Sequence, residues 1–159
     1  MKKFILNPSL PDMYFDKAYQ EEYSKKFSNI LKYDFISIQN ESYVTNGLLR
    51  IRSWFCQHIM MDTSNVFVSK QLKEKLLELN FCAESYFSNI AYGWVIDPDT
   101  DPIDLPEFFH LDLTQKNKEE HIYIKYDESD RPVLYVSCEF LHIVLSMSDD
   151  EWLTYEEVS

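Results

Sequence analysis

Glycine is almost missing from this chain of 159 residues, in which only Gly47 and Gly93 occur. A loop that cradles a phosphate needs glycines, because side chains would hold the backbone away from the anion. The sequence therefore leaves no place for the glycine-rich loop of a nucleotide-binding fold. We expect a fold without a nucleotide site, and we predict no cofactor.

The size and apolar content of the chain favour one well-buried domain. Hydrophobic residues make up 45% of the sequence and aromatic residues 16%. Large rings bury enough area to offset the entropy that the chain loses on folding. At this length one core is expected rather than two. We predict a single acidic domain that spans residues 1–159.

Helical spacing of apolar residues predicts several helices. Aromatic residues recur at steps of four from Phe15 to Phe27, and Ile30 and Leu31 continue the stripe at steps of three and four, which predicts an amphipathic helix over residues 13–31. Residues 48–61 fit a helix and, in part, a strand, and we favour the helix. A capping box at residues 148–151 predicts a short last helix.

Two serines are placed as helix N-caps. Ser69 and Ser137 each follow an apolar strand-like run and precede apolar residues at helical spacing. A side-chain oxygen at this position can accept a hydrogen bond from an unpaired backbone N–H of the first turn. The predicted helices lie near residues 69–80 and 137–147.

Alternation of apolar residues predicts the strands. The longest alternation runs from Tyr86 to Ile96 and predicts a central strand. Shorter runs predict strands at residues 4–6, 35–38, 66–68, 108–113, 121–126 and 133–136. The combination predicts an α+β fold in which a mixed or mostly antiparallel sheet is packed with three to four helices.

Two segments share one order of residues. Val66–Leu72 and Leu134–Phe140 each run from an apolar strand through a serine into a helix. A remote internal duplication would produce this pattern. Two unrelated junctions between a strand and a helix would produce it too, and that simpler interpretation is favoured.

Cysteine usage and the N-terminus indicate the compartment. Cys56, Cys82 and Cys138 are odd in number and widely spaced, which is typical of free thiols in a reducing environment. The N-terminus is basic, but its apolar run Phe4–Leu6 is far too short for a signal peptide. No stretch approaches the roughly 18 apolar residues of a membrane span. We expect a cytoplasmic protein.

The candidate metal ligands complete no known pattern. Asp97, Asp99 and Asp101 occupy the first, third and fifth positions of a calcium loop. That loop also requires a glycine and a bidentate glutamate, where this chain has Pro102 and Phe108. No paired zinc motif accompanies the scattered soft ligands, which are Cys56, His58, His110, His121, Cys138 and His142. We predict no metal site.

The candidate catalytic pairs are also incomplete. Cys138 and His142 would lie one helical turn apart, and His110 shortly precedes Asp112. No nucleophile elbow or other recognised catalytic frame surrounds either pair. We predict a protein that is not an enzyme. An enzyme whose site is assembled from residues distant in sequence is the alternative.

Negative charge is concentrated in the second part of the chain. Residues 97–159 hold seventeen Asp and Glu against four Lys and Arg, whereas residues 1–96 hold ten against eleven, and the formal net charge is −12. A one-sided field attracts basic partners and repels nucleic acid and anionic membranes. We therefore predict a basic protein partner, and binding to neither nucleic acid nor membrane.

The predicted contact surface combines acids with aromatic anchors. Aromatic residues among charges are typical of binding hot spots, and the last predicted helix supplies two of them. The acids fall into clusters at 97–107, 127–130 and 149–157. The predicted partner-binding residues are Asp97, Asp99, Asp101, Asp104, Glu107, Asp127, Glu128, Asp130, Asp149, Asp150, Glu151, Trp152, Tyr155, Glu156 and Glu157.

Three segments carry a family resemblance: the opening Lys3–Pro8, Val66–Ser69 leading into Leu72–Leu77, and Phe81–Phe87. With them the chain, mainly over residues 1–95, resembles immunity proteins of bacterial polymorphic-toxin and contact-dependent inhibition systems. The resemblance implies an inhibitor that binds a cognate toxin domain and blocks its active site or an essential interaction. An acidic inhibitor or DNA mimic from a phage or mobile element is the alternative.

Overall fold

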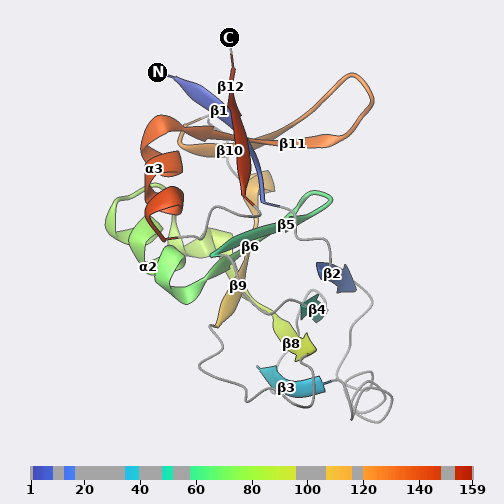
Figure 1. The fold of residues 1–159 in the computed structure, drawn as a ribbon. Coiled ribbons are helices and arrows are strands. Elements are labelled where there is room, and N and C mark those ends of the chain that lie inside the picture. Colours follow the sequence, from blue (N-terminus) through green and yellow to red (C-terminus); the bar gives the residue numbers. More distant parts are fainter. Residues whose placement is uncertain are drawn as a thin grey trace.

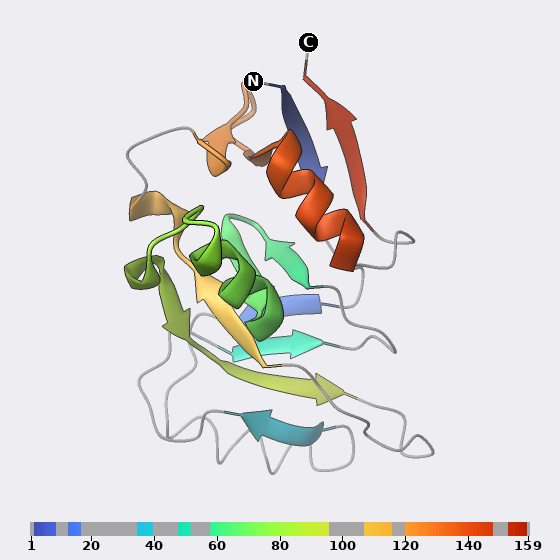
Figure 2. The same ribbon diagram turned by 90° about the vertical axis from the view of Figure 1, so that its left-hand side faces the viewer.

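The computed structural model describes residues 2–8, 13–16, 35–39, 48–51, 58–95, 107–115, 120–147 and 153–158. These residues form three four-stranded sheets, which we name A, B and C, and two α-helices. Figure 1 shows sheet A at one end of the molecule. The two helices lie on one side, which faces the viewer in Figure 2.

Sheet A brings the two ends of the chain together. Its strand order is β10 (Ile122–Tyr126), β11 (Pro132–Ser137), β1 (Lys3–Asn7) and β12 (Thr154–Glu157). All neighbours are antiparallel. The N-terminal strand β1 is therefore an inner strand, held between β11 and β12 (Figure 1). The helix α3 (Cys138–Met147) packs against β1 and β11.

Sheet C has the same antiparallel arrangement. Its strand order is β5 (Ile59–Asp62), β6 (Asn65–Ser69), β9 (Phe108–Leu111) and β7 (Phe87–Asn89). The helix α2 (Lys70–Glu78) follows β6 directly and packs against β6 and β9. Leu72 and Leu76 are the buried residues of this helix.

Sheet B has both kinds of strand pairing. Its order is β2 (Met13–Asp16), β4 (Leu48–Ile51), β8 (Ala91–Val95) and β3 (Phe35–Gln39). β4 and β8 are parallel, whereas the other two pairs are antiparallel. Two short 3-10 helices complete the described elements, η1 (Glu84–Tyr86) and η2 (Leu113–Gln115).

One apolar core joins sheets A and C. It contains Leu6 from β1, Val68 from β6, Leu72 from α2 and Phe140 from α3, each at most 2% exposed. Burial of one such side chain contributes about 1.5–3 kcal/mol relative to an exposed position. The two sheets and the two helices therefore depend on one another for stability.

The expected fold, with three to four helices on one mixed or mostly antiparallel sheet, is wrong. The described residues contain two α-helices, and most of the remaining elements are strands in separate sheets. Strand β2 stands at the start of the helix expected over 13–31, and residues 17–34 lie outside the description. Strands β4 and β5 replace the helix favoured for residues 48–61. The partners of β4 are β2 and β8, which come from distant parts of the chain and which local periodicity does not reveal. The strand β5 pairs with the next strand, β6, in a hairpin.

Two further predictions need correction. The strand expected from Tyr86 to Ile96 is interrupted at the buried residue Ile90. Its two parts, β7 and β8, belong to different sheets. Tyr155, expected on a short last helix, lies on strand β12, and the capping box at 148–151 lies outside the described residues.

The helices predicted from capping serines are confirmed. Helix α2 begins after Ser69, whose Oγ accepts a hydrogen bond from the Leu72 N–H at 3.2 Å. Helix α3 begins after Ser137, whose Oγ accepts one from the Phe140 N–H at 3.1 Å. Both serines are fully buried. These bonds satisfy backbone donors that the first turn of a helix otherwise leaves unpaired.

A histidine completes each serine cap. Nδ1 of His58 lies 2.6 Å from the Ser69 Oγ, and Nδ1 of His121 lies 2.8 Å from the Ser137 Oγ. The backbone repeats the same link, because each serine N–H donates to the carbonyl of its histidine, at 2.8 and 2.9 Å. The two hairpins, β5–β6 and β10–β11, and the helices that follow them are thus built alike, including the histidine and serine that link them.

The likeness extends to whole sheets. β9 borders β6 in sheet C as β1 borders β11 in sheet A, and β7 and β12 occupy the corresponding outer positions. β1 precedes the first hairpin in the chain and β9 precedes the second, yet each pairs in the sheet of the other hairpin. The described part of the chain therefore has two similar units that exchange a strand, and the shared pattern at Val66–Leu72 and Leu134–Phe140 reflects this repetition.

We predict that replacing either capping serine destabilises the protein. Ser69→Ala or Ser137→Ala removes an N-cap, which costs about 0.5–2 kcal/mol, and also leaves a histidine Nδ1 without its hydroxyl partner. Urea unfolding measures the loss. Ser146→Ala is the matched control, because Ser146 is exposed and its hydroxyl donates to the nearby Ile143 carbonyl; it should change stability by less than about 0.5 kcal/mol. Equal effects of all three changes would contradict the role of the caps.

We also predict a dependence of stability on pH through His58. Burial lowers the pKa of His58 below the ordinary value of 6.5, so the unfolded chain binds this proton more readily than the folded one. The contribution of neutral His58 to the free energy of unfolding is present above pH 6.5, and it is lost as the pH falls through the pKa of the folded state. Urea unfolding above and below pH 6.5 measures the effect. The free energy of unfolding should fall less at the lower pH in His58→Asn than in the unchanged protein. An identical loss in both would exclude His58 as a cause.

Candidate functional site

The predicted partner-binding residues fall partly outside the described chain. The description does not include eight of them, which are Asp97, Asp99, Asp101, Asp104, Asp149, Asp150, Glu151 and Trp152. Glu107 is partly buried beside sheet C, where its carbonyl accepts a hydrogen bond from the Lys70 N–H at 2.8 Å. The remaining residues belong to sheet A, at the β10–β11 turn and on β12.

The turn between β10 and β11 uses one of its acids for its own structure. The Asp127 Oδ1 accepts hydrogen bonds from the backbone N–H groups of Ser129 and Arg131, both at 2.9 Å. Asp130 has a positive φ of 60°, a conformation that aspartate tolerates better than most residues. Glu128 and Asp130 are exposed. Among the turn acids, these two are better placed than Asp127 to meet a partner.

The strand β12 carries the other described acids. All four of its residues are exposed. The ring of Tyr155 meets Phe4 edge-on, with centroids 6.1 Å apart, and remains 50% exposed. Glu157 forms an ion pair with Lys2 at 3.5 Å, which contributes little because both side chains are in water.

Sheet A keeps these two groups of acids apart. The turn belongs to β10 and β11, whereas β12 is the outer strand on the opposite edge, with β1 between β11 and β12. The described acids of sheet A therefore form two separate surfaces. Glu107 belongs to neither, because it lies beside sheet C. Of the two surfaces, the one on β12 has a hollow beside it.

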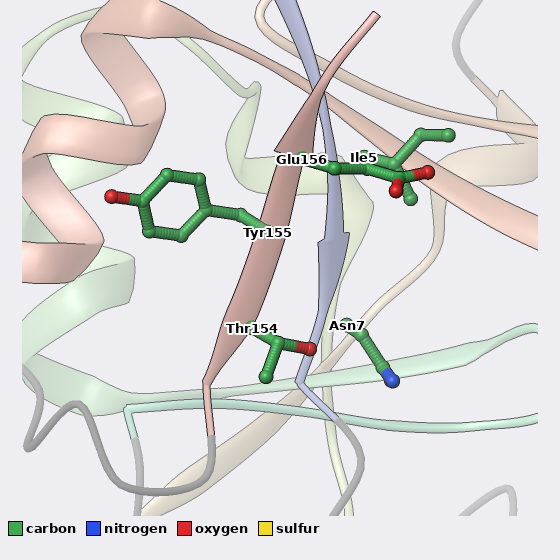
Figure 3. A pocket seen from close by; sticks show the side chains of 5 residues that line it. All are labelled: Ile5, Asn7, Thr154, Tyr155 and Glu156. Atoms are coloured by element: carbon green, nitrogen blue, oxygen red, sulfur yellow. The ribbon is translucent and has the colours of Figure 1, made fainter.

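The hollow lies along β1 and β12 and has a volume of about 320 Å³. Ile5, Asn7, Thr154, Tyr155 and Glu156 line it. Figure 3 shows the Ile5 and Glu156 side chains on one side of the sheet and the Tyr155 ring on the other. Ile5 and Glu156 are direct cross-strand partners, which places their side chains on the same face. The hollow thus combines an apolar wall with a carboxylate.

The face that holds the hollow changes character away from β12. Tyr123 and Tyr135 stack there with ring centroids 5.3 Å apart and planes inclined by 7°. The Lys3 Nζ lies 4.9 Å from the centre of the Tyr123 ring, and the Lys125 Nζ lies 5.9 Å from it. This part of the face is aromatic and basic, so its acidic character is confined to the margin formed by β12.

The candidate catalytic and metal-binding groups form no complete site in the described residues. The Cys138 Sγ lies 4.0 Å from the His142 Nε2, without a third group that would orient the histidine in a known hydrolytic arrangement. The pKa of Glu139 is lowered, mainly by a hydrogen bond to its own backbone, and this acid is fully exposed. No three His, Cys, Asp or Glu side chains in this part of the chain are placed to hold a metal ion.

The two His–Ser pairs were not predicted as pairs. Their serine hydroxyls are fully buried and already serve as helix caps, so the geometry gives them a structural role. The sequence does contain a signal for them, because His-Ile occurs at 58–59 and again at 121–122, each upstream of a capping serine. The hollow has no such signal, since its walls come from the two ends of the chain.

Comparison with known proteins identifies no relative of this chain. No family model, no curated protein and no solved structure matches it. In the structure, no helix within the described ranges is long and apolar enough to cross a membrane. The function must therefore be argued from the residues and geometry of the chain itself.

Proposed function

We propose that this chain is a cytoplasmic immunity protein that binds a cognate bacterial toxin domain and neutralises it through an acidic surface. The observation that carries the proposal is the charge distribution, with seventeen acidic against four basic residues in positions 97–159. The resemblance of residues 1–95 to immunity proteins supports it. The proposed role is that of an inhibitor rather than an enzyme.

The described acids suit this role because they face water. Glu128, Asp130, Glu156 and Glu157 are exposed on sheet A. Exposed carboxylates of one sign steer a basic partner towards the surface and speed association. A toxin that cuts nucleic acid has a basic cleft for its substrate, and carboxylates can occupy such a cleft in place of phosphates. Inhibition then requires only tight binding over the cleft.

Co-expression tests the proposal directly. An immunity gene normally follows the gene of its toxin, so the polypeptide encoded immediately upstream is the candidate toxin. We predict that this polypeptide arrests bacterial growth when it is expressed alone and that co-expression of the full chain restores growth. Growth arrest that the chain does not relieve would contradict the proposal, as would an upstream polypeptide without toxicity.

The acidic surface has its own test. We predict that Glu128→Lys combined with Glu156→Lys weakens toxin binding by about tenfold or more and flattens its salt dependence. Glu74→Lys with Glu78→Lys is the matched control, because both residues are exposed on α2 and the change in net charge is equal. Titration calorimetry at low and high salt gives the affinities. Similar losses in both variants would show that net charge, and not these positions, governs binding.

A further inference from the structure

Within the described residues, the outer side of β12 is an open strand edge. Among the strands whose burial is described, β12 is the one in which every residue is exposed. No described strand pairs with its outer side. An unpaired edge of this kind presents backbone donors and acceptors to which another chain can add as a strand.

The register identifies the backbone groups that are available. The Val158 N–H donates to the Lys3 carbonyl at 2.9 Å, and Glu156 is the cross-strand partner of Ile5. In an antiparallel ladder every second residue bonds to the same neighbour. Residues 154, 156 and 158 therefore bond towards β1, and the N–H and C=O groups of Tyr155 and Glu157 point outwards.

An added strand would place its side chains alternately on two different surfaces. On one face lies the hollow, with the Ile5 side chain as an apolar wall and the Glu156 carboxylate beside it (Figure 3). A lysine or arginine fits this combination, because its stem can pack on Ile5 while its head group meets the carboxylate. On the other face lies the half-exposed Tyr155 ring, which offers contact to an apolar side chain.

The charge of the edge selects its occupant. Glu156 and Glu157 stand next to each other on β12, so a second copy of β12 paired edge to edge would bring like charges together. Away from the edge, Lys3 and Lys125 flank the tyrosine pair and disfavour a basic segment lying across the face. The field therefore favours a basic strand along β12 and disfavours pairing between two copies of this chain.

We propose that a basic, extended segment of the partner protein adds to β12 as a fifth strand of sheet A. Its lysine or arginine enters the hollow against Glu156, and the apolar residue that follows packs on Tyr155. The inference deepens the proposed function, on which it rests, by naming the docking edge and the alternation of the segment that it receives. It assigns no role to the acids of the β10–β11 turn.

Amide hydrogen exchange on the full chain tests the edge. The probe is a short synthetic peptide that alternates lysine and valine, and its control alternates glutamate and valine. We expect the lysine peptide to slow exchange at the Tyr155 and Glu157 N–H groups, and the glutamate peptide to leave them unchanged. Glu156→Gln should weaken binding of the lysine peptide by about tenfold, whereas Glu74→Gln, at an exposed position of helix α2, should leave it unchanged.

A second variant removes one outward donor. In Glu157→Pro the lost N–H faces away from β1, so the ladder within sheet A is retained, and the slowed exchange at Tyr155 should disappear. The edge inference is overturned if the lysine peptide does not slow amide exchange at Tyr155 and Glu157, or if both peptides slow it equally. Growth protection by the unchanged chain together with an unprotected edge would remove this inference and leave the proposed function. A protected edge without growth protection would contradict the proposed function as a toxin inhibitor and leave β12 as an edge that binds a basic strand.

Discussion

The pairing of β1 with β11 and β12 is the constraint on which the rest of the structure depends. Without β1, the strand β12 would have no neighbour in sheet A, and Leu6 would be missing from the core that joins sheets A and C. Because β9 makes the equivalent pairing in sheet C, neither hairpin unit completes its own sheet. The exchanged strands, more than any surface ion pair, hold the two units together.

Local signals in the sequence predict only what local physics determines. Ser69 and Ser137 are found from sequence because a capping serine and the apolar positions after it act within one or two helical turns. Met13–Asp16 and Leu48–Ile51 form strands against the helical expectation, because they pair with each other across a long separation in sequence. Such pairing is decided by the whole chain, so periodicity within a short window misassigns it.

In the candidate site, too, some features follow from residue type and others only from the order of the strands. Exposure of Glu156 and Glu157 follows from their charge, since unpaired carboxylates avoid burial, and the sequence predicts their place on the surface. That Tyr155 lies on an edge strand does not follow, because an edge exists only once the order of strands is known. The hollow depends on the same order, because Ile5 and Glu156 come from opposite ends of the chain. Residue type therefore predicts the chemistry of the site, and topology determines its shape.

The inner position of β1 also affects how the protein is made. The ribosome synthesises β1 long before its partners Pro132–Ser137 and Thr154–Glu157. At about 5–20 residues per second, the first strand waits on the order of ten seconds for its neighbours. During that interval the apolar residues Phe4 and Leu6 have no sheet to join. Sheet A is therefore completed only after β12 has left the ribosome, and until then β1 is accessible to chaperones.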